Sequence, residues 1–214
     1  ADPATFTWTA QGGGVYRATV NLAEPHVVLA NNARLFPYQS LSDLQTLRWG
    51  VPGFFASGAT LYVRLANNAD PNASAMIVSR YNYAFYVQQN YIYFVNLTLR
   101  HYGQGSYAKA IYFIDASDNL VQGSTFVADD IGVALKYDSH RNVIQDNTFY
   151  DFIGDWPWEG VKAVGTALLV EDGGVYVYDP LSGRGNVIRR NIFHDDFDGL
   201  HVCPWQAGLT SETD

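Results

Sequence analysis

The sequence is poor in cysteine and in charged residues. Its single cysteine, Cys203, excludes an intramolecular disulfide framework. Lysine and arginine number 13 against 21 aspartates and glutamates, which gives a formal net charge of −8. Because so few basic side chains are available to neutralise phosphates, we expect no nucleic-acid partner. No apolar run reaches the roughly eighteen residues of a membrane-spanning helix, so we expect no membrane partner either.

The chain is instead rich in apolar and aromatic residues. Hydrophobic residues make up 48% of the sequence and charged residues only 16%, a composition that excludes a disordered chain. The aromatic residues are 15 tyrosines, 12 phenylalanines and 5 tryptophans. A length of 214 residues fits one domain or one elongated array of repeats, with ample material for a core.

A repeat organises the middle of the chain. Three phrases share one pattern: DNLVQGSTF at 118–126, RNVIQDNTF at 141–149 and GNVIRRNIF at 185–193. Their common asparagines, Asn119, Asn142 and Asn186, are 23 and 44 residues apart, so the second interval is close to twice the first. Short β-branched and aromatic runs that recur at such a period between Gly, Asn and Asp are typical of a solenoid of coiled strands.

A second kind of run accompanies these phrases. The runs at 111–114, 133–136 and 200–203 alternate as a strand with one buried face does. We expect each rung to hold one strand of this kind and one strand of the Asn-Val-Ile type. Rungs stacked about 4.8 Å apart would enclose an apolar interior. Their asparagine amides would hydrogen-bond from rung to rung as a ladder.

With these phrases the sequence resembles the right-handed parallel β-helix proteins of the pectate-lyase-like superfamily, over roughly residues 53–205. The resemblance implies an all-β chain, a right-handed parallel β-helix solenoid with an N-terminal cap region of hairpins and a short helix. It also implies a secreted protein, extracellular or periplasmic, whose partner is a polysaccharide. The superfamily includes polysaccharide lyases and glycoside hydrolases, and it places substrate on the parallel-strand face.

Residues 1–74 are predicted to lead into the coil and residues 75–214 to form its rungs. Strand pairs at 5–20 and 27–36 predict two hairpins. Ser40 begins a short amphipathic helix that we expect to cover the first rung. Regularity fails at 152–184, where the long interval holds either two plain rungs or one rung with an inserted hairpin; we favour the insertion. No segment is evident that would cover the last rung, which predicts either a truncated coil or end-to-end self-association there.

Acidic residues stand just before the strands that open the rungs. In register they would form an acidic column whose oxygen atoms suit a hard cation, so Ca²⁺ is the predicted cofactor. The predicted metal ligands are Asp130, Glu159 and Asp172. The alternative is ordinary turn chemistry, in which aspartate bonds its own backbone and the following glycine supplies positive φ.

The outward side chains of the opening strands predict a sugar-binding face. Aromatic rings stack on sugar rings while their polar tips bond hydroxyl groups. The predicted substrate-binding residues are Tyr112, Trp156, Trp158, Tyr176, Tyr178 and Trp205.

The predicted catalytic residues are Lys136, Arg141, Lys162, His201 and Asp198. Lys136 would abstract the proton α to a uronate carboxylate, while a cation or Arg141 neutralises that carboxylate. The alternative for Lys136 and Lys162 is a solvated lysine on a strand face.

Three functions stay open from the sequence. The first is an extracellular polysaccharide lyase or glycoside hydrolase. The second is a non-catalytic glycan-binding or adhesive module, because no complete catalytic set is present. The third is a structural, self-assembling β-helix, and the fold alone cannot choose among them.

Overall fold

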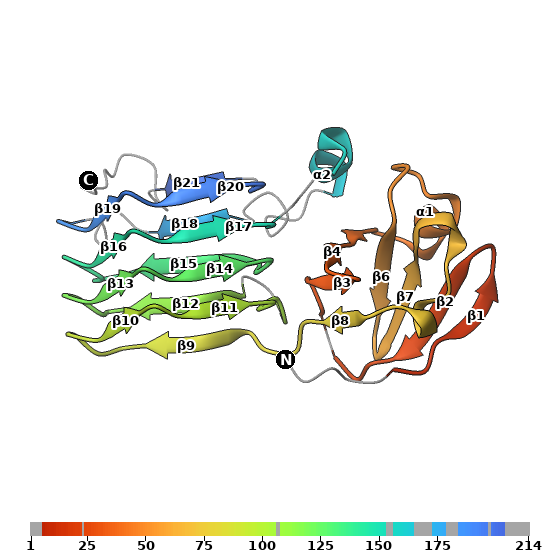
Figure 1. Cartoon of the computed structure of the whole chain (residues 1–214), viewed down its shortest axis with the longest axis horizontal. Helices are drawn as coiled ribbons and strands as arrows, with labels where there is room; N and C mark the ends of the chain where they lie inside the picture. The colour runs from red at the N-terminus through yellow and green to blue at the C-terminus, as the bar shows by residue number, and fades with distance from the viewer. Residues whose placement is uncertain are drawn as a thin grey trace.

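The computed structural model describes residues 6–22, 24–105, 108–152, 156–164, 173–178, 184–196 and 198–203. Figure 1 shows two parts side by side, a coil of stacked parallel strands and a smaller N-terminal unit of mainly antiparallel strands. No helix within these ranges is long and apolar enough to cross a membrane.

Two small sheets build the N-terminal unit. The larger has the order β1 (Thr9–Gly12), β2 (Val15–Thr19), β7 (Thr60–Arg64), β6 (Gly53–Ser57) and β5 (Phe36–Pro37). The smaller has the order β4 (Ala33–Arg34), β3 (Val28–Ala30) and β8 (Met76–Val78), and two short 3-10 helices, η1 (Ala66–Asn68) and η2 (Pro71–Ala73), precede β8. The pairs β1–β2 and β3–β4 are antiparallel hairpins at the predicted places. One apolar cluster that includes Trp8, Phe54 and Val28 joins the two sheets.

The short helix is α1 (Leu41–Thr46). Ser40 caps it, because its Oγ accepts a hydrogen bond from the Asp43 backbone N–H at 3.0 Å. The buried Leu44 joins a cluster with Phe36 and Tyr38, and the helix packs on β6 and β7. It therefore covers the N-terminal sheet rather than the first rung of the coil.

Three parallel sheets form the coil, and each rung contributes one strand to each of them. The long sheet contains β9 (Tyr83–Val87), β12 (Lys109–Ile114), β15 (Ile131–Lys136), β18 (Gly173–Tyr178) and β21 (Asp198–Cys203). The first short sheet contains β10 (Tyr93–Val95), β13 (Leu120–Gln122), β16 (Val143–Gln145) and β19 (Val187–Arg189). The second short sheet contains β11 (Thr98–Arg100), β14 (Thr125–Val127), β17 (Thr148–Tyr150) and β20 (Ile192–His194).

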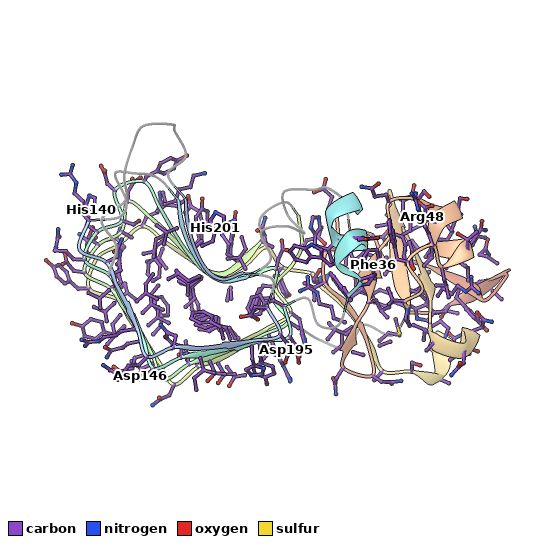
Figure 2. The ribbon with its side chains drawn as sticks, turned by 90° about the horizontal axis from the view of Figure 1, so that it is seen from above. Phe36, Arg48, His140, Asp146, Asp195 and His201 are labelled. Carbon is purple, nitrogen blue, oxygen red and sulfur yellow. The ribbon has the colours of Figure 1, made fainter. Side chains whose placement is uncertain are left out.

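Each rung has three strands, whereas the sequence predicted two. The nine-residue phrase is two strands and not one, because the chain bends inside it at residues such as Gly123 and Asp146, whose φ angles are +60° and +57°. Asp146 tolerates this left-handed conformation because its short polar side chain bonds locally. Figure 2 looks along the stack and shows the resulting three-sided section, with His140, Asp146 and Asp195 at its corners.

One rung spans the 44-residue interval, since β16 pairs directly with β19 and β17 with β20. The extra residues include α2 (Trp158–Val164), whose Val161 packs with Phe36 and Leu44 of the N-terminal unit. The expectation that Lys162 lies on a strand is wrong, because Trp158–Val164 is a helix. Of the predicted hairpin, β18 is the second strand, and the first lies outside the described residues.

Stacked identical side chains hold the coil together. The rings of Phe126 and Phe149 stack at 4.6 Å, and those of Phe149 and Phe193 at 5.0 Å. The predicted asparagine ladder is present: Asn119 Nδ2 donates to Asn142 Oδ1 at 3.0 Å, and Asn142 Nδ2 donates to Asn186 Oδ1 at 3.1 Å. These contacts fix the register of the rungs, and the register decides which outer side chains become neighbours.

Candidate functional site

The outer face of the long sheet brings several predicted site residues into line. In its pairing register, Tyr112 lies between Tyr86 and Ala134, and Tyr176 lies between Ala134 and His201. A neighbouring column runs through Lys136, Tyr178 and Cys203. The inward residues of the same strands, among them Ile111, Val133 and Val175, lie in the coil core. For Tyr176, Tyr178 and Asp198 the structure describes only the backbone.

A cluster of three tyrosines dominates the lower end of this face. The ring of Tyr112 stacks on Tyr83 at 5.6 Å and meets Tyr86 edge-on at 5.7 Å. Tyr112 is buried beneath these rings, whereas Tyr86 is 50% exposed. The ammonium of the buried Lys109 lies 4.7 Å from the centre of the Tyr112 ring. Tyr86 therefore presents a ring to solvent, while Tyr112 and Lys109 support it from below.

Burial sets the charge state of this cluster. It raises the pKa of the Tyr112 phenol well above the usual range, and the neighbouring phenols of Tyr83 and Tyr137 add to the rise. Burial also raises the pKa of Tyr83. These hydroxyl groups consequently keep their protons at any physiological pH and can both donate and accept hydrogen bonds.

Lys136 and His201 lie farther along the same face. Lys136 is half-buried, and its Nζ lies 5.0 Å from the centre of the Tyr137 ring. His201 is partly exposed beside Tyr176 in the register, and Figure 2 places it on the long side of the section. Asp198 begins β21 in register with Gly173, at the end of the strand away from Lys136. The face thus combines phenol, ammonium and imidazole groups.

Arg141 does not reach this face. It lies at the corner between the long and the first short sheet, where its Nε and Nη2 each lie 2.7 Å from an oxygen of Asp118. The guanidinium hydrogen bond holds the pKa of the Asp118 carboxyl below its usual value. The predicted role of Arg141 beside a substrate carboxylate has no support from this position.

The insertion carries four predicted site residues away from the long sheet. Lys162, Glu159 and Trp158 lie on α2, and Trp156 packs edge-on against Phe36 at 5.3 Å. The sequence missed this because it assigned Lys162 to a strand. Trp156 serves the junction with the N-terminal unit, and Trp158 and Glu159 are exposed. Trp205 and Asp172 lie outside the described residues.

The predicted calcium site does not assemble from the residues that are described. Asp130 is only 1% exposed and Glu159 lies on a helix, so the two do not share an exposed column. Among the described residues no three acidic, histidine or cysteine side chains are placed to hold a metal ion. Asp130 and Glu159 therefore do not form a calcium site with each other, and no chemical step is assigned to the cation.

Buried acids occupy the junction between the coil and the N-terminal unit instead. Asp129 Oδ1 accepts a hydrogen bond from the Tyr102 backbone N–H at 2.9 Å, while its Oδ2 has no partner. Burial raises the pKa of Asp129 well above its usual value. Arg34 Nη1 donates to the Asp129 carbonyl at 3.3 Å, and His26 Nδ1 lies 3.9 Å from Asp130 Oδ2. The acids thus belong to an interface and not to the outer face of the long sheet.

Sequence reasoning missed Tyr83, Tyr86 and Lys109. A signal was present, because YAFYV at 83–87 and KAIYF at 109–113 share the Ala-x-Tyr pattern and pair in register. It was overlooked because the first rung lacks the Asn-Val-Ile phrase that marks the others.

Comparison with known proteins agrees with the fold. The family described as "Right handed beta helix region" matches residues 61–213. A solved structure described as the complex of XylC with xylose is similar with a TM-score of 0.53 at 13% identity, over 92% of this chain and 47% of that chain. This chain therefore spans about half the length of that protein, and an identity so low shows a shared fold alone. No curated protein sequence matches the chain.

Proposed function

Because this chain belongs to the right-handed β-helix family, as the match over residues 61–213 shows, we propose that it binds a polysaccharide on the outer face of its long sheet. The observation that carries the proposal is the cluster of Tyr83, Tyr86 and Tyr112 with Lys109 beneath it. We place the protein in the extracellular space or the periplasm, because that is where it would encounter a polysaccharide ligand.

The chemistry of the face suits a sugar chain. The exposed ring of Tyr86 can cover the apolar face of a pyranose while its phenol bonds a sugar hydroxyl group. Equivalent residues of successive strands recur at about 4.8 Å, so a ligand lying along the stack meets Tyr86 at one end and the position of His201 at the other. The XylC structure holds a sugar, xylose, which supports a ligand of this class.

Retention on immobilised polysaccharides tests the binding proposal. A panel of neutral and acidic polysaccharides is screened by affinity electrophoresis, and the best ligand is carried into titration. Tyr86→Ala removes the exposed ring, so we expect about a tenfold or greater loss of affinity, in line with an aromatic contact of roughly 1.5 kcal/mol. The matched control is Tyr150→Ala, which removes a partly exposed ring from the second short sheet. Equal losses in the two variants, or none in either, would refute the proposal.

Catalysis is a second candidate function, favoured by the position of Lys136 on the same face. Its ammonium lies in the column next to that of Tyr112 and Tyr176. As a neutral amine, Lys136 would take the proton α to the carboxylate of a uronic acid held by the tyrosines, and the glycosidic oxygen would leave from the neighbouring ring carbon. This lyase reaction gives an unsaturated sugar and a new reducing end. A glycoside hydrolase would release new reducing ends without any unsaturated product.

The same panel distinguishes catalysis from binding. Products are followed by absorbance of the unsaturated sugar and by reducing ends, with added Ca²⁺ and with chelator. If Lys136 is the base, Lys136→Ala abolishes product while retention is kept, and Lys162→Ala on α2 changes neither. Retention without any product leaves a glycan-binding module as the function.

A further inference from the structure

The first rung of the coil, residues 81–100, exposes an unusual number of large apolar side chains. Twelve such side chains are exposed among the described residues, and seven of them belong to this rung. The seven are Tyr81, Phe85, Tyr86, Tyr91, Ile92, Tyr93 and Val95. An apolar concentration of this kind on a soluble protein marks a surface that another molecule covers.

The exposure has a structural cause. β9, β10 and β11 each end their sheet, so one edge of every strand in the rung lacks a neighbouring strand. Phe85 pairs with Ile111 in the next rung, yet Phe85 is 39% exposed and Ile111 is 0% exposed. Figure 1 shows the N-terminal unit beside the coil, not beneath β9. The described residues therefore leave backbone N–H and C=O groups and a core-facing ring uncovered at this end.

The rung carries no acidic residue that would repel a second copy of this acidic chain. Residues 81–100 contain no aspartate or glutamate, although the chain carries 21 and has a formal net charge of −8. Natural sheet edges are usually protected by charged side chains. Here Arg100 at the end of β11 is the only charged residue. Two copies of this acidic protein can thus approach each other through this rung without repulsion between acids.

The rung is also self-complementary. β10 and β11 each have three residues and meet at the corner formed by residues 96–97, opposite the long sheet. Asp146 occupies the same corner in the third rung, and Figure 2 shows this corner on the side of the section opposite the long sheet. Consider a two-fold axis that lies across the end of the coil and passes through this corner and Phe85. Rotation about it reverses the direction of every strand in the second copy and exchanges the positions of the two short sheets. It sets β9 against its own copy and β10 against β11 of the other copy.

We infer that the first rung is the interface of a symmetric dimer, in which a second copy of this chain adds its own first rung in antiparallel pairing. In this register Phe85 meets Phe85, Phe94 meets Leu99, and Tyr93 meets Arg100 of the other copy. The guanidinium then lies over a tyrosine ring, a favourable contact. Because the contact is isologous, assembly closes at two copies and does not continue into fibres.

The dimer is of modest strength. About twenty residues a side is the low end of a standard interface, so dissociation in the micromolar range is expected. The two long sheets become one continuous sheet, with the Tyr86 clusters of both copies on the same side of it. The dimer does not depend on the proposed glycan binding, and its test uses no glycan.

Sedimentation velocity of the 214-residue chain, from about 1 to 200 µM, tests the inference. We expect a shift from the 23.8 kDa monomer to twice that mass and no further. Arg100→Glu places two acids in the interface and raises the dissociation constant about tenfold or more. Arg17→Glu is the matched control, because it makes the same charge change at an exposed position of β2 and leaves the dimer intact.

A cross-linking measurement tests the same interface without relying on the Arg100→Glu variant, which could lose the dimer simply by misfolding. In a Cys203→Ser background, Phe85→Cys places two thiols across the two-fold axis, at the separation of directly opposed residues in antiparallel strands. Oxidation should give a covalent dimer, and Ser57→Cys on the N-terminal unit should not. A monomer at every concentration, a mass that keeps growing, or an Arg100→Glu dimer as tight as the wild type would each overturn the inference.

Discussion

At the scale of single residues, burial at the junction has a chemical consequence. Asp196 follows β20, and both its carboxyl oxygens are buried without a hydrogen-bond partner. Burial raises its pKa to about 8, and the nearby Asp195 and Asp151 add to the rise. Nearby, burial lowers the pKa of His101 to about 4. Folding therefore favours the neutral form of both groups, so stability must depend on pH.

The pH dependence has a definite sign. Asp196 has a higher pKa in the folded than in the unfolded chain, so its contribution to stability is complete at low pH and is lost as the pH rises to about 8. His101 has a lower pKa in the folded than in the unfolded chain, so its effect on stability has the opposite sign. Its contribution is lost as the pH falls toward 4 and is complete above about pH 6.5. Between about pH 6.5 and 8 the contribution of His101 is constant while that of Asp196 is lost, so stability falls.

Asp196→Asn should flatten this dependence. Denaturant unfolding at pH 6.5 and 8 should show the wild type losing about 1 kcal/mol or somewhat more, after allowance for the partial exposure of Asp196. Asp196→Asn should lose less, since asparagine cannot ionise. Asp138→Asn, at an exposed position of another corner, should keep the wild-type slope. A wild-type stability that rises over this interval would contradict the assignment.

At the scale of elements, the asparagine ladder sets the spacing of the rungs. Asn142 Oδ1 accepts from the backbone N–H and the Nδ2 of Asn119, and its Nδ2 donates to the Ala116 carbonyl at 2.9 Å. Asn142 is only 1% exposed, so water cannot replace these partners. The asparagines of the ladder thus link three successive rungs by hydrogen bonds.

Asn142→Ala should cost roughly 2–4 kcal/mol of unfolding free energy, because it leaves several buried donors and acceptors without partners. Thr148→Ala is the control, since Thr148 lies half-exposed on a nearby strand of the same rung and should cost less than about 1 kcal/mol. Both values come from urea unfolding followed by circular dichroism. Similar costs for the two variants would show that the ladder does not stabilise the coil.

The sequence predicts the rungs well where neighbouring copies constrain one another. Asn119, Asn142 and Asn186 recur because a stacked position repeats its environment, and this repetition is visible without coordinates. The bend at Asp146 was missed, because aspartate in a left-handed turn looks like any polar residue within a strand phrase. Lys162 was misplaced because α2 takes its stability from Val161 packing on a remote unit, a contact that no local pattern encodes.

At the scale of the whole molecule, three parts meet at one corner of the coil. Arg34 of β4 donates to the Asp129 carbonyl, and its guanidinium lies 5.2 Å from the centre of the Trp156 ring. Val27 and Leu29 of the N-terminal unit pack with Ala128 of the coil. These contacts fix the N-terminal unit and the insertion at that corner. Sequence could not predict this placement, because the partners are about a hundred residues apart.

The outer face of the long sheet is the surface on which the functional account depends. Its columns are fixed by strand pairing from Tyr86 to His201. The sequence predicted the outward residues of four of its five strands, β12, β15, β18 and β21, from period-two alternation. It did not predict that Tyr112 would be buried beneath Tyr83 and Tyr86, because the first rung lacks the Asn-Val-Ile phrase that marks the other rungs.

A crystal structure of the chain with the oligosaccharide that binds best in the screen tests this account most directly. We predict a sugar ring stacked on Tyr86, with the rest of the ligand extending along the long sheet toward Lys136 and His201. An oligosaccharide bound on either short sheet or on the N-terminal unit, with Tyr86 still open to solvent, would contradict it.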